Sequence, residues 1–293
     1  MTRVAGMVVL SLLGGCWPLH AQASSGPRRG SLVLTGGEFG TGVIERFAAL
    51  AGGAGASVVY IPSASSGIKL PSGFTWVPPE LPDATNNTPD FQQELSKLFG
   101  LRVTVLHSRD RAVWNSDSVA NALGRADAVW ISGGNAGRLA SLVLGTRSER
   151  ALRGLLDRGR VIGGNSAGAI IAGSFIVRGR PDKPVLMARG HERGLGFLRD
   201  VVINAHLTKS KREGELVQVI DAHPRLLGIG IDEKAAIVVR GDEVEVIGEG
   251  RVAIYDNQKH GETWYYYLSP GTTFDLKTRT VRSGSDSKTP PAG

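Results

Sequence analysis

Residues 160–169 read Arg-Val-Ile-Gly-Gly-Asn-Ser-Ala-Gly-Ala, and this stretch decides the fold. The run 160–162, with apolar Val161 and Ile162, is typical of a short strand, and Ser166 opens an apolar helix. Glycines two residues before and two residues after Ser166 allow the backbone to turn sharply between these elements. Such a turn holds a serine hydroxyl above the carboxyl edge of a parallel sheet. The sequence therefore predicts an α/β fold built around Ser166.

Strand and helix patterns alternate on both sides of this turn. The predicted strands before it are 31–34, 57–62, 102–106 and 126–132. The predicted helices are 41–50, 88–99, 116–123 and 147–157. Because the strands are largely apolar, we expect a mostly parallel sheet with helices on both faces. The proline-rich segment 63–87 predicts a long irregular loop.

The pattern changes after about residue 226. Short β-rich runs at 226–231, 235–239, 244–247, 251–255 and 263–268 alternate with Gly-rich turns. They predict additional C-terminal β-strands, as an extra layer or an antiparallel sheet edge. We expect a polar linker at 24–30, one domain at 31–282 and a disordered tail at 283–293.

The first 23 residues predict a signal peptide, and therefore a periplasmic or secreted protein. Arg3 precedes a largely apolar stretch, and Ala21-Gln22-Ala23 has the small residues of a cleavage site. The apolar stretch is too short and too interrupted to predict a membrane span. Cys16, the only cysteine, also fits a lipoprotein signal, so its lipidation is an alternative to cleavage after Ala23.

Composition argues against several classes of partner and cofactor. The net charge is +7, but Lys and Arg are scattered and form no basic stripe with aromatic residues, so we expect no nucleic acid. The sequence has no P-loop and no H-E-x-x-H, and 37–42 lacks the dinucleotide spacing. We therefore predict no metal and no cofactor. A monomer and a homodimer are both left open.

Ser166 is a candidate nucleophile, and the amide of Ala167 at the helix start is a candidate oxyanion donor. A serine nucleophile needs a base. His206 follows a β-like run at 201–204, so it should emerge at a strand end. Asp232 and Glu233 end another apolar run, and strand alternation points only one of them toward the site. These patterns alone leave His206 equally a base or a structural residue.

Six ordered motifs resemble the cyanophycinase and dipeptidase E family of serine peptidases, over nearly all of residues 31–256. They are Leu34-Thr35-Gly36-Gly37, Tyr60-Ile61-Pro62-Ser63-Ala64-Ser65, Ile131-Ser132-Gly133-Gly134-Asn135, Gly164-Asn165-Ser166-Ala167-Gly168, the His206 segment ending Gly214-Glu215-Leu216, and Gly228-Ile229-Gly230-Ile231-Asp232-Glu233. The resemblance implies a three-layer sandwich of the class I glutamine-amidotransferase-like or flavodoxin-like kind.

The resemblance also implies roles for individual residues. Ser166 would attack, His206 would act as general base, and Glu233 would orient the histidine. The amide of Gly134 would join that of Ala167 in an oxyanion hole. The implied reaction is hydrolysis of a peptide or isopeptide bond through an acyl-enzyme.

This chain departs from cyanophycinases around the expected substrate pocket. It has Asn135-Ala136, Asn204-Ala205, Ser210 and Arg212 where that family carries glutamines, an acid and two arginines. We predict substrate binding by Asn135, Asn204 and Arg212. Loss of the acid argues against cyanophycin itself, and the cations favour an anionic group on the substrate. A solvated helix face is the alternative explanation for Arg212 and its neighbouring lysines.

Two other functions stay open. A lipase- or esterase-like α/β-hydrolase orders its triad Ser, Asp, His, which would make His260 the base. An exported binding protein could retain the same fold without catalysis.

Overall fold

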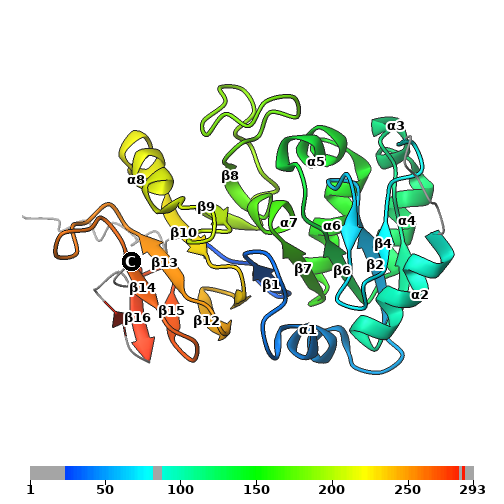
Figure 1. Ribbon diagram of the computed structural model, residues 1–293, viewed down its shortest axis with the longest axis horizontal. Coiled ribbons are helices and arrows are strands. Elements are labelled where there is room, and N and C mark those ends of the chain that lie inside the picture. Colours follow the sequence, from blue (N-terminus) through cyan, green and yellow to red (C-terminus); the bar gives the residue numbers. More distant parts are fainter. Residues whose placement is uncertain (1–23, 82–87, 284–285, 288–293) are drawn as a thin grey trace, which may run out of the picture.

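The computed structural model describes residues 24–81, 88–283 and 286–287 (Figure 1). The predicted signal peptide and its Cys16 lie outside the described residues. Within the described part, no helix is long and apolar enough to cross a membrane.

A nine-stranded sheet forms the larger part of the molecule. Its parallel half contains, in order, β1 (Ser31–Thr35), β7 (Val161–Asn165), β6 (Ala128–Ile131), β2 (Ser57–Ile61) and β5 (Arg102–Val105). Antiparallel strands continue it beyond β1, in the order β11 (Ala235–Arg240), β12 (Glu243–Gly248), β15 (Thr273–Asp275) and β16 (Thr280–Ser283).

Helices cover both faces of the parallel half. They are α1 (Val43–Ala51), α2 (Thr88–Phe99), α3 (Arg111–Trp114), α4 (Asp117–Arg125), α5 (Ala136–Val143), α6 (Arg147–Asp157) and α7 (Ala167–Ile170). Successive strand residues face opposite sides. Val33 of β1 therefore packs in a cluster with α1 and α2, whereas Leu32 and Leu34 pack in a cluster that includes α4, α5 and α6.

A second, six-stranded sheet lies beside the first. Its order is β17 (Asp286–Ser287), β14 (Tyr266–Leu268), β13 (Val252–Tyr255), β10 (Leu227–Ile231), β9 (Leu198–Ala205) and β8 (Gly173–Ile176). Strands β8, β9 and β10 are parallel, and helix α8 (Glu213–Ala222) packs on β10 and β13.

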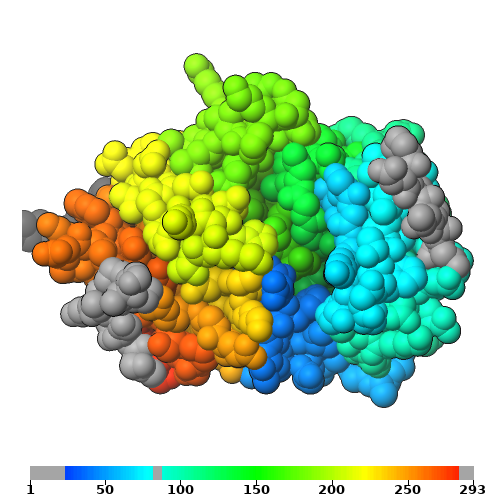
Figure 2. Space-filling model, in the orientation of Figure 1, coloured from blue at the N-terminus to red at the C-terminus, as the bar shows by residue number. Residues whose placement is uncertain are grey.

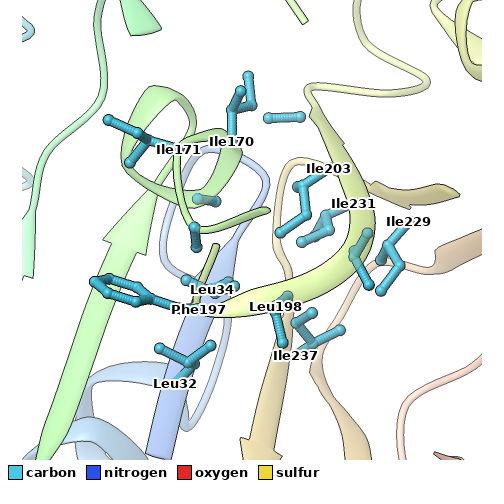
Figure 3. Close-up of a cluster of buried hydrophobic side chains, with 14 of the residues drawn as sticks. Leu32, Leu34, Ile170, Ile171, Phe197, Leu198, Ile203, Ile229, Ile231 and Ile237 are labelled. Atoms are coloured by element: carbon cyan, nitrogen blue, oxygen red, sulfur yellow. The ribbon is translucent and has the colours of Figure 1, made fainter. Parts of the chain in front are cut away.

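One continuous apolar cluster joins the two sheets. Figure 3 shows Leu32 and Leu34 of β1 on one side of the cluster, and Ile203 of β9 with Ile229 and Ile231 of β10 on the other. All five side chains are at most 1% exposed. The strand ends of both sheets are consequently held in fixed positions relative to one another.

The predicted fold class is confirmed: a mostly parallel sheet with helices, and additional C-terminal strands. Those strands divide between both sheets instead of forming one layer. The expected loop contains a hairpin, β3 (Ile68–Lys69) with β4 (Thr75–Trp76), and the helix after Ser166 is a single turn.

Helix α5 had no counterpart in the sequence analysis. Strand β16 ends at Ser283, the first residue of the expected tail, and β17 lies within that tail. The expected linker is also held in place, because the Asp242 carboxylate accepts hydrogen bonds from the amides of Ser25 and Gly26.

Candidate active site

Ser166 lies at the carboxyl end of β7, on the turn into α7. Its backbone has φ 51° and ψ −114°, a region that costs a non-glycine residue about 1–3 kcal/mol. A Cβ on Gly164 would lie 2.7 Å from the carbonyl carbon of Gly168, so the flanking glycines permit the close crossing of strand and helix. The G-x-S-x-G spacing thus has a steric cause. The sharp turn that it permits exposes the serine hydroxyl at the edge of the sheet.

His206 and Glu233 meet Ser166 from the other sheet. His206 follows the last residue of β9, and its Nε2 lies 2.8 Å from Ser166 Oγ. Its Nδ1 lies 2.6 Å from Glu233 Oε2, and Glu233 follows β10 by two residues. Because an ionised carboxylate only accepts hydrogen bonds, Nδ1 carries the proton and Nε2 is free to accept one from the serine. The three side chains form a continuous chain of hydrogen bonds.

Lys209 binds the oxygen of Glu233 that does not face the histidine. Its Nζ lies 3.1 Å from Glu233 Oε1 and 3.4 Å from Glu38 Oε1. Burial alone would raise the pKa of the Glu233 carboxyl, but hydrogen bonds from His206 and Lys209 outweigh burial and lower that pKa. Glu233 is therefore held as a carboxylate. The sequence analysis gave Lys209 no such role; its position three residues after His206 was the available signal.

The adjacent acid, Asp232, points elsewhere. Its Oδ1 accepts hydrogen bonds from the amide and hydroxyl of Thr208, and its Oδ2 accepts from the amide of Arg251. Asp232 thus fixes the loop that follows His206. Strand alternation separates the two acids as the sequence analysis expected.

The lowered pKa of Glu233 predicts a specific dependence of stability on pH. The native carboxyl binds its proton less readily than the unfolded one, whose ordinary pKa is 4.5. The resulting stabilisation is present above that value and is lost as pH falls through the depressed pKa. Denaturant unfolding of wild type and Glu233→Gln across the acid range measures it. We expect the difference in unfolding free energy to shrink as pH falls; parallel curves would contradict the assignment.

Gly37 leaves the space that the His206–Glu233 pair occupies. A Cβ at this position would lie 2.6 Å from Glu233 Oε1 and 2.8 Å from His206 Cε1. Gly37→Ala should therefore displace the pair and lower kcat by about 10²-fold, the effect of a misplacement near 1 Å. Gly124→Ala on α4 is the matched control, because its Cβ would contact nothing within 4 Å. Equal activity of the two variants would refute this role.

A cavity of about 820 Å³ opens above Ser166. Its lining comes from segments 37–39, 67–71, 132–134 and 165–166, together with Tyr60, Ser65, His206, Glu233 and Lys234. Figure 2 shows the surface hollowed between the cyan and yellow segments, with green atoms at its floor. Charges of both signs line it, since Glu38 and Lys69 belong to the same cavity.

The Gly133–Gly134 loop lies against the serine. A Cβ on Gly133 would be 3.0 Å from the Cβ of Ser166. Among the described residues, no hydrogen bond uses the amide of Gly134 or that of Ala167. Gly134 has φ 133°, and a Cβ there would lie 2.2 Å from the carbonyl oxygen of Ala64. Both predicted oxyanion donors thus have N–H groups without a partner in the part of the chain that the structure describes.

The three predicted substrate-binding residues do not line this cavity. Asn135 caps α5, accepting from the amide of Arg138 at 2.8 Å and donating to the carbonyl of Pro181 at 3.0 Å. Asn204 is fully buried and binds Arg178 and Glu215. Arg212 donates to the carbonyl of Ala205, next to His206, at 3.2 Å. Their binding role stays a prediction, and their contacts are structural.

Other histidines lie outside this arrangement. His107 Nδ1 is 3.1 Å from Ser63 Oγ, and its Nε2 is 3.0 Å from Glu80 Oε2. Burial lowers the pKa of the His107 imidazole more than Glu80 raises it. His260 Nε2 lies 2.9 Å from Asp256 Oδ1, in the turn between β13 and β14. Neither lines the cavity, so neither is placed to act as the base for Ser166.

Tyr60 is a cavity residue to which the sequence analysis gave no role. It is 4% exposed, and burial raises the pKa of its hydroxyl to about 12, against the effect of a hydrogen bond with Ser132. Its hydroxyl consequently stays protonated beside the Gly133–Gly134 loop. In the described residues, no group of three or more His, Cys, Asp or Glu side chains is arranged to hold a metal ion.

The family is decided by comparison with known proteins. The peptidase family S51 model matches residues 32–247, most of the chain. This chain belongs to peptidase family S51. It is a serine-type peptidase of the cyanophycinase and peptidase E kind.

Curated relatives and solved structures agree with this membership. The cyanophycinase of Geminocystis herdmanii is 30% identical over 238 residues, covering 79% of this S51 peptidase and 82% of the relative. The cyanophycinase of Synechococcus elongatus is 29% identical over 253 residues, covering 84% and 73%. The structure of a peptidase from an acI-B1 Actinobacterium shares the fold with a TM-score of 0.64 at 20% identity, covering 86% and 98%. A putative peptidase E protein from Listeria monocytogenes gives a TM-score of 0.52 at 19% identity, covering 75% and 98%.

Proposed function

We propose that this S51 peptidase hydrolyses an aspartyl peptide or isopeptide bond through an acyl-enzyme on Ser166. One observation carries the proposal: the unbroken hydrogen-bond chain from Ser166 Oγ through His206 to Glu233, at 2.8 and 2.6 Å. It has the connectivity of a serine–histidine–acid triad, with a glutamate as the acid. It opens into the 820 Å³ cavity, which has room for a short peptide.

The proposed chemistry has two halves. His206 Nε2 removes the Ser166 proton while Oγ attacks the carbonyl carbon, and the imidazolium then gives that proton to the departing amine. Water next attacks the acyl-enzyme, losing its proton to His206, and Ser166 recovers its own as the acid product leaves. The unpartnered amides of Gly134 and Ala167 are the donors for the oxyanion in both halves.

Labelling tests the nucleophile without knowledge of the substrate. A fluorophosphonate probe should phosphonylate folded wild-type protein at Ser166, with displacement of fluoride, and should leave Ser166→Ala unlabelled. Peptide mapping identifies the modified residue. Failure to label folded wild type would favour a binding protein that has kept the fold.

A substrate screen tests the bond. The position that carries an acid in cyanophycinases is Asn204 here, a residue bound to Arg178 and Glu215 instead of lining the cavity. We therefore expect α- or β-aspartyl dipeptides to be hydrolysed faster than cyanophycin, as measured by amine release. Faster hydrolysis of cyanophycin would contradict this part of the proposal.

We further propose that the protein is exported and that residues 1–23 are removed. The support is the charged start, the apolar stretch and the Ala21-Gln22-Ala23 site. Mass spectrometry of the mature protein from a bacterial host should find Ser24 at the N-terminus. An acylated N-terminal Cys16 would establish the lipoprotein alternative.

A further inference from the structure

Two partly buried arginines, Arg109 and Arg138, stand behind the Gly133–Gly134 loop. Arg138 lies in the first turn of α5, and its Nη1 donates to the carbonyl oxygen of Ala64 at 2.9 Å. The amide of Asn135 donates to the same oxygen, also at 2.9 Å. Arg109 donates from Nη2 to the next carbonyl, that of Ser65. The peptide group joining residues 65 and 66 is therefore held at the carbonyl of Ser65, and the peptide group joining residues 64 and 65 is held at its own carbonyl, that of Ala64.

This peptide group is the surface on which Gly134 rests. A Cβ on Gly134 would lie 2.4 Å from the carbonyl carbon of Ala64 and 2.6 Å from the nitrogen of Ser65. A side chain at position 134 would therefore have no room between the loop that follows β2 and the loop that follows β6. Any displacement of residues 64 and 65 is thus transmitted directly to Gly134, whose amide faces no partner within the described chain.

The positive charge of Arg138 is energetically unfavourable in its surroundings, and its presence there calls for an explanation. Burial lowers the pKa of the Arg138 guanidinium, and the neighbouring charge of Arg109 lowers it further. Two guanidinium groups share one nearby carboxylate, Glu80, which already binds Arg109 at 2.6 Å. A neutral side chain would avoid this repulsion, but it could not make a charge-assisted hydrogen bond to the Ala64 carbonyl.

We propose that Arg138 is a positioning residue for the oxyanion hole: it fixes the Ala64 carbonyl and thereby sets the direction of the Gly134 N–H. The inference rests on the proposed function of Ser166. Arg138 touches no reacting atom in this scheme. Its effect should appear only as the carbonyl carbon becomes tetrahedral, when the oxyanion requires both donors.

The test compares Arg138→Met with Arg111→Met. Arg111 is the matched control, because its guanidinium also donates to backbone carbonyls, those of Ser141 and Leu144 at the far end of α5. For Arg138→Met we expect kcat to fall about 10- to 100-fold, less than complete loss of an oxyanion donor, with KM nearly unchanged. Affinity for a peptide boronic acid, which mimics the tetrahedral state, should fall in parallel. Arg111→Met should keep wild-type kcat.

Further variants separate this role from a general effect on folding. Arg138→Lys can still donate one hydrogen bond to Ala64, so it should recover most of the lost kcat. Thermal unfolding of each variant reports any loss of stability. Equal kcat for the Arg138→Met and Arg111→Met variants, or a loss confined to KM, would overturn the inference while Ser166 chemistry stood. A wild type that neither labels nor hydrolyses any screened peptide would instead overturn the proposed function and this inference with it.

Discussion

Ser166→Ala is expected to lower the hydrolysis rate by about 10⁴- to 10⁶-fold, the range found for knockouts of serine triads. Among the described residues, the only hydrogen bond of Ser166 Oγ is with His206. Removing the hydroxyl therefore eliminates the nucleophile without leaving a buried group of the fold unsatisfied. The variant should unfold at nearly the wild-type temperature. Initial rates on the best dipeptide of the substrate screen, together with thermal unfolding, measure both quantities.

A serine outside the cavity provides the control for this variant. Ser174 lies on β8, and within residues 24–81, 88–283 and 286–287 its hydroxyl has one hydrogen bond, to the carbonyl of Val201 at 3.5 Å. Ser174→Ala should keep wild-type activity. If Ser166→Ala also hydrolysed peptides at the wild-type rate, the nucleophile would have to lie elsewhere in the chain.

The second large effect is expected at His206. His206→Ala removes the group that takes the serine proton, so we expect a loss of about 10⁴-fold in kcat or more. His260→Ala should retain nearly full activity, because His260 is bound to Asp256 and lies outside the cavity. Steady-state kinetics of the two variants on the same substrate separate the alternatives. The reverse result, with only His260→Ala inactive, would establish the lipase-like order of residues.

Much of the fold could be predicted because its signals are local. The parallel strands are apolar along most of their length, so β1, β2 and β6 were expected within two residues of their observed bounds. Strand β7 was expected at 160–162, and in the structure it extends to Asn165. Helix α5 was missed because it begins directly after the Gly133–Gly134 turn. Its cap, Asn135, was interpreted as a substrate ligand. An asparagine at this position can cap a helix or bind a substrate, and only its contacts in the structure distinguish these two roles.

The candidate site was harder to predict than the fold because it depends on contacts between distant segments. Ser166, His206 and Glu233 were singled out at strand ends, and the resemblance selected among the histidines. The neighbours of these residues were not foreseen. Lys209 reaches Glu233 through a loop whose path depends on Asp232, and its position three residues after His206 does not by itself indicate that path. Substrate contacts were likewise predicted for Asn204 and Arg212. Asn204 binds Arg178 and Glu215, and Arg212 binds the carbonyl of Ala205, so their binding role stays a prediction.

The two sheets contribute different parts of the proposed machinery. The nucleophile stands at the edge of one sheet, and the imidazole and its carboxylate stand at the edge of the other. Apolar packing and several chain connections, among them that from β7 through α7 to β8 and that from β10 to β11, keep these edges in register. A small shift of one sheet relative to the other would break the hydrogen bond between Ser166 and His206, and with it proton transfer, while every strand stayed paired. The rate of hydrolysis is accordingly a more sensitive measure of the relative position of the two sheets than any spectroscopic measure of secondary structure.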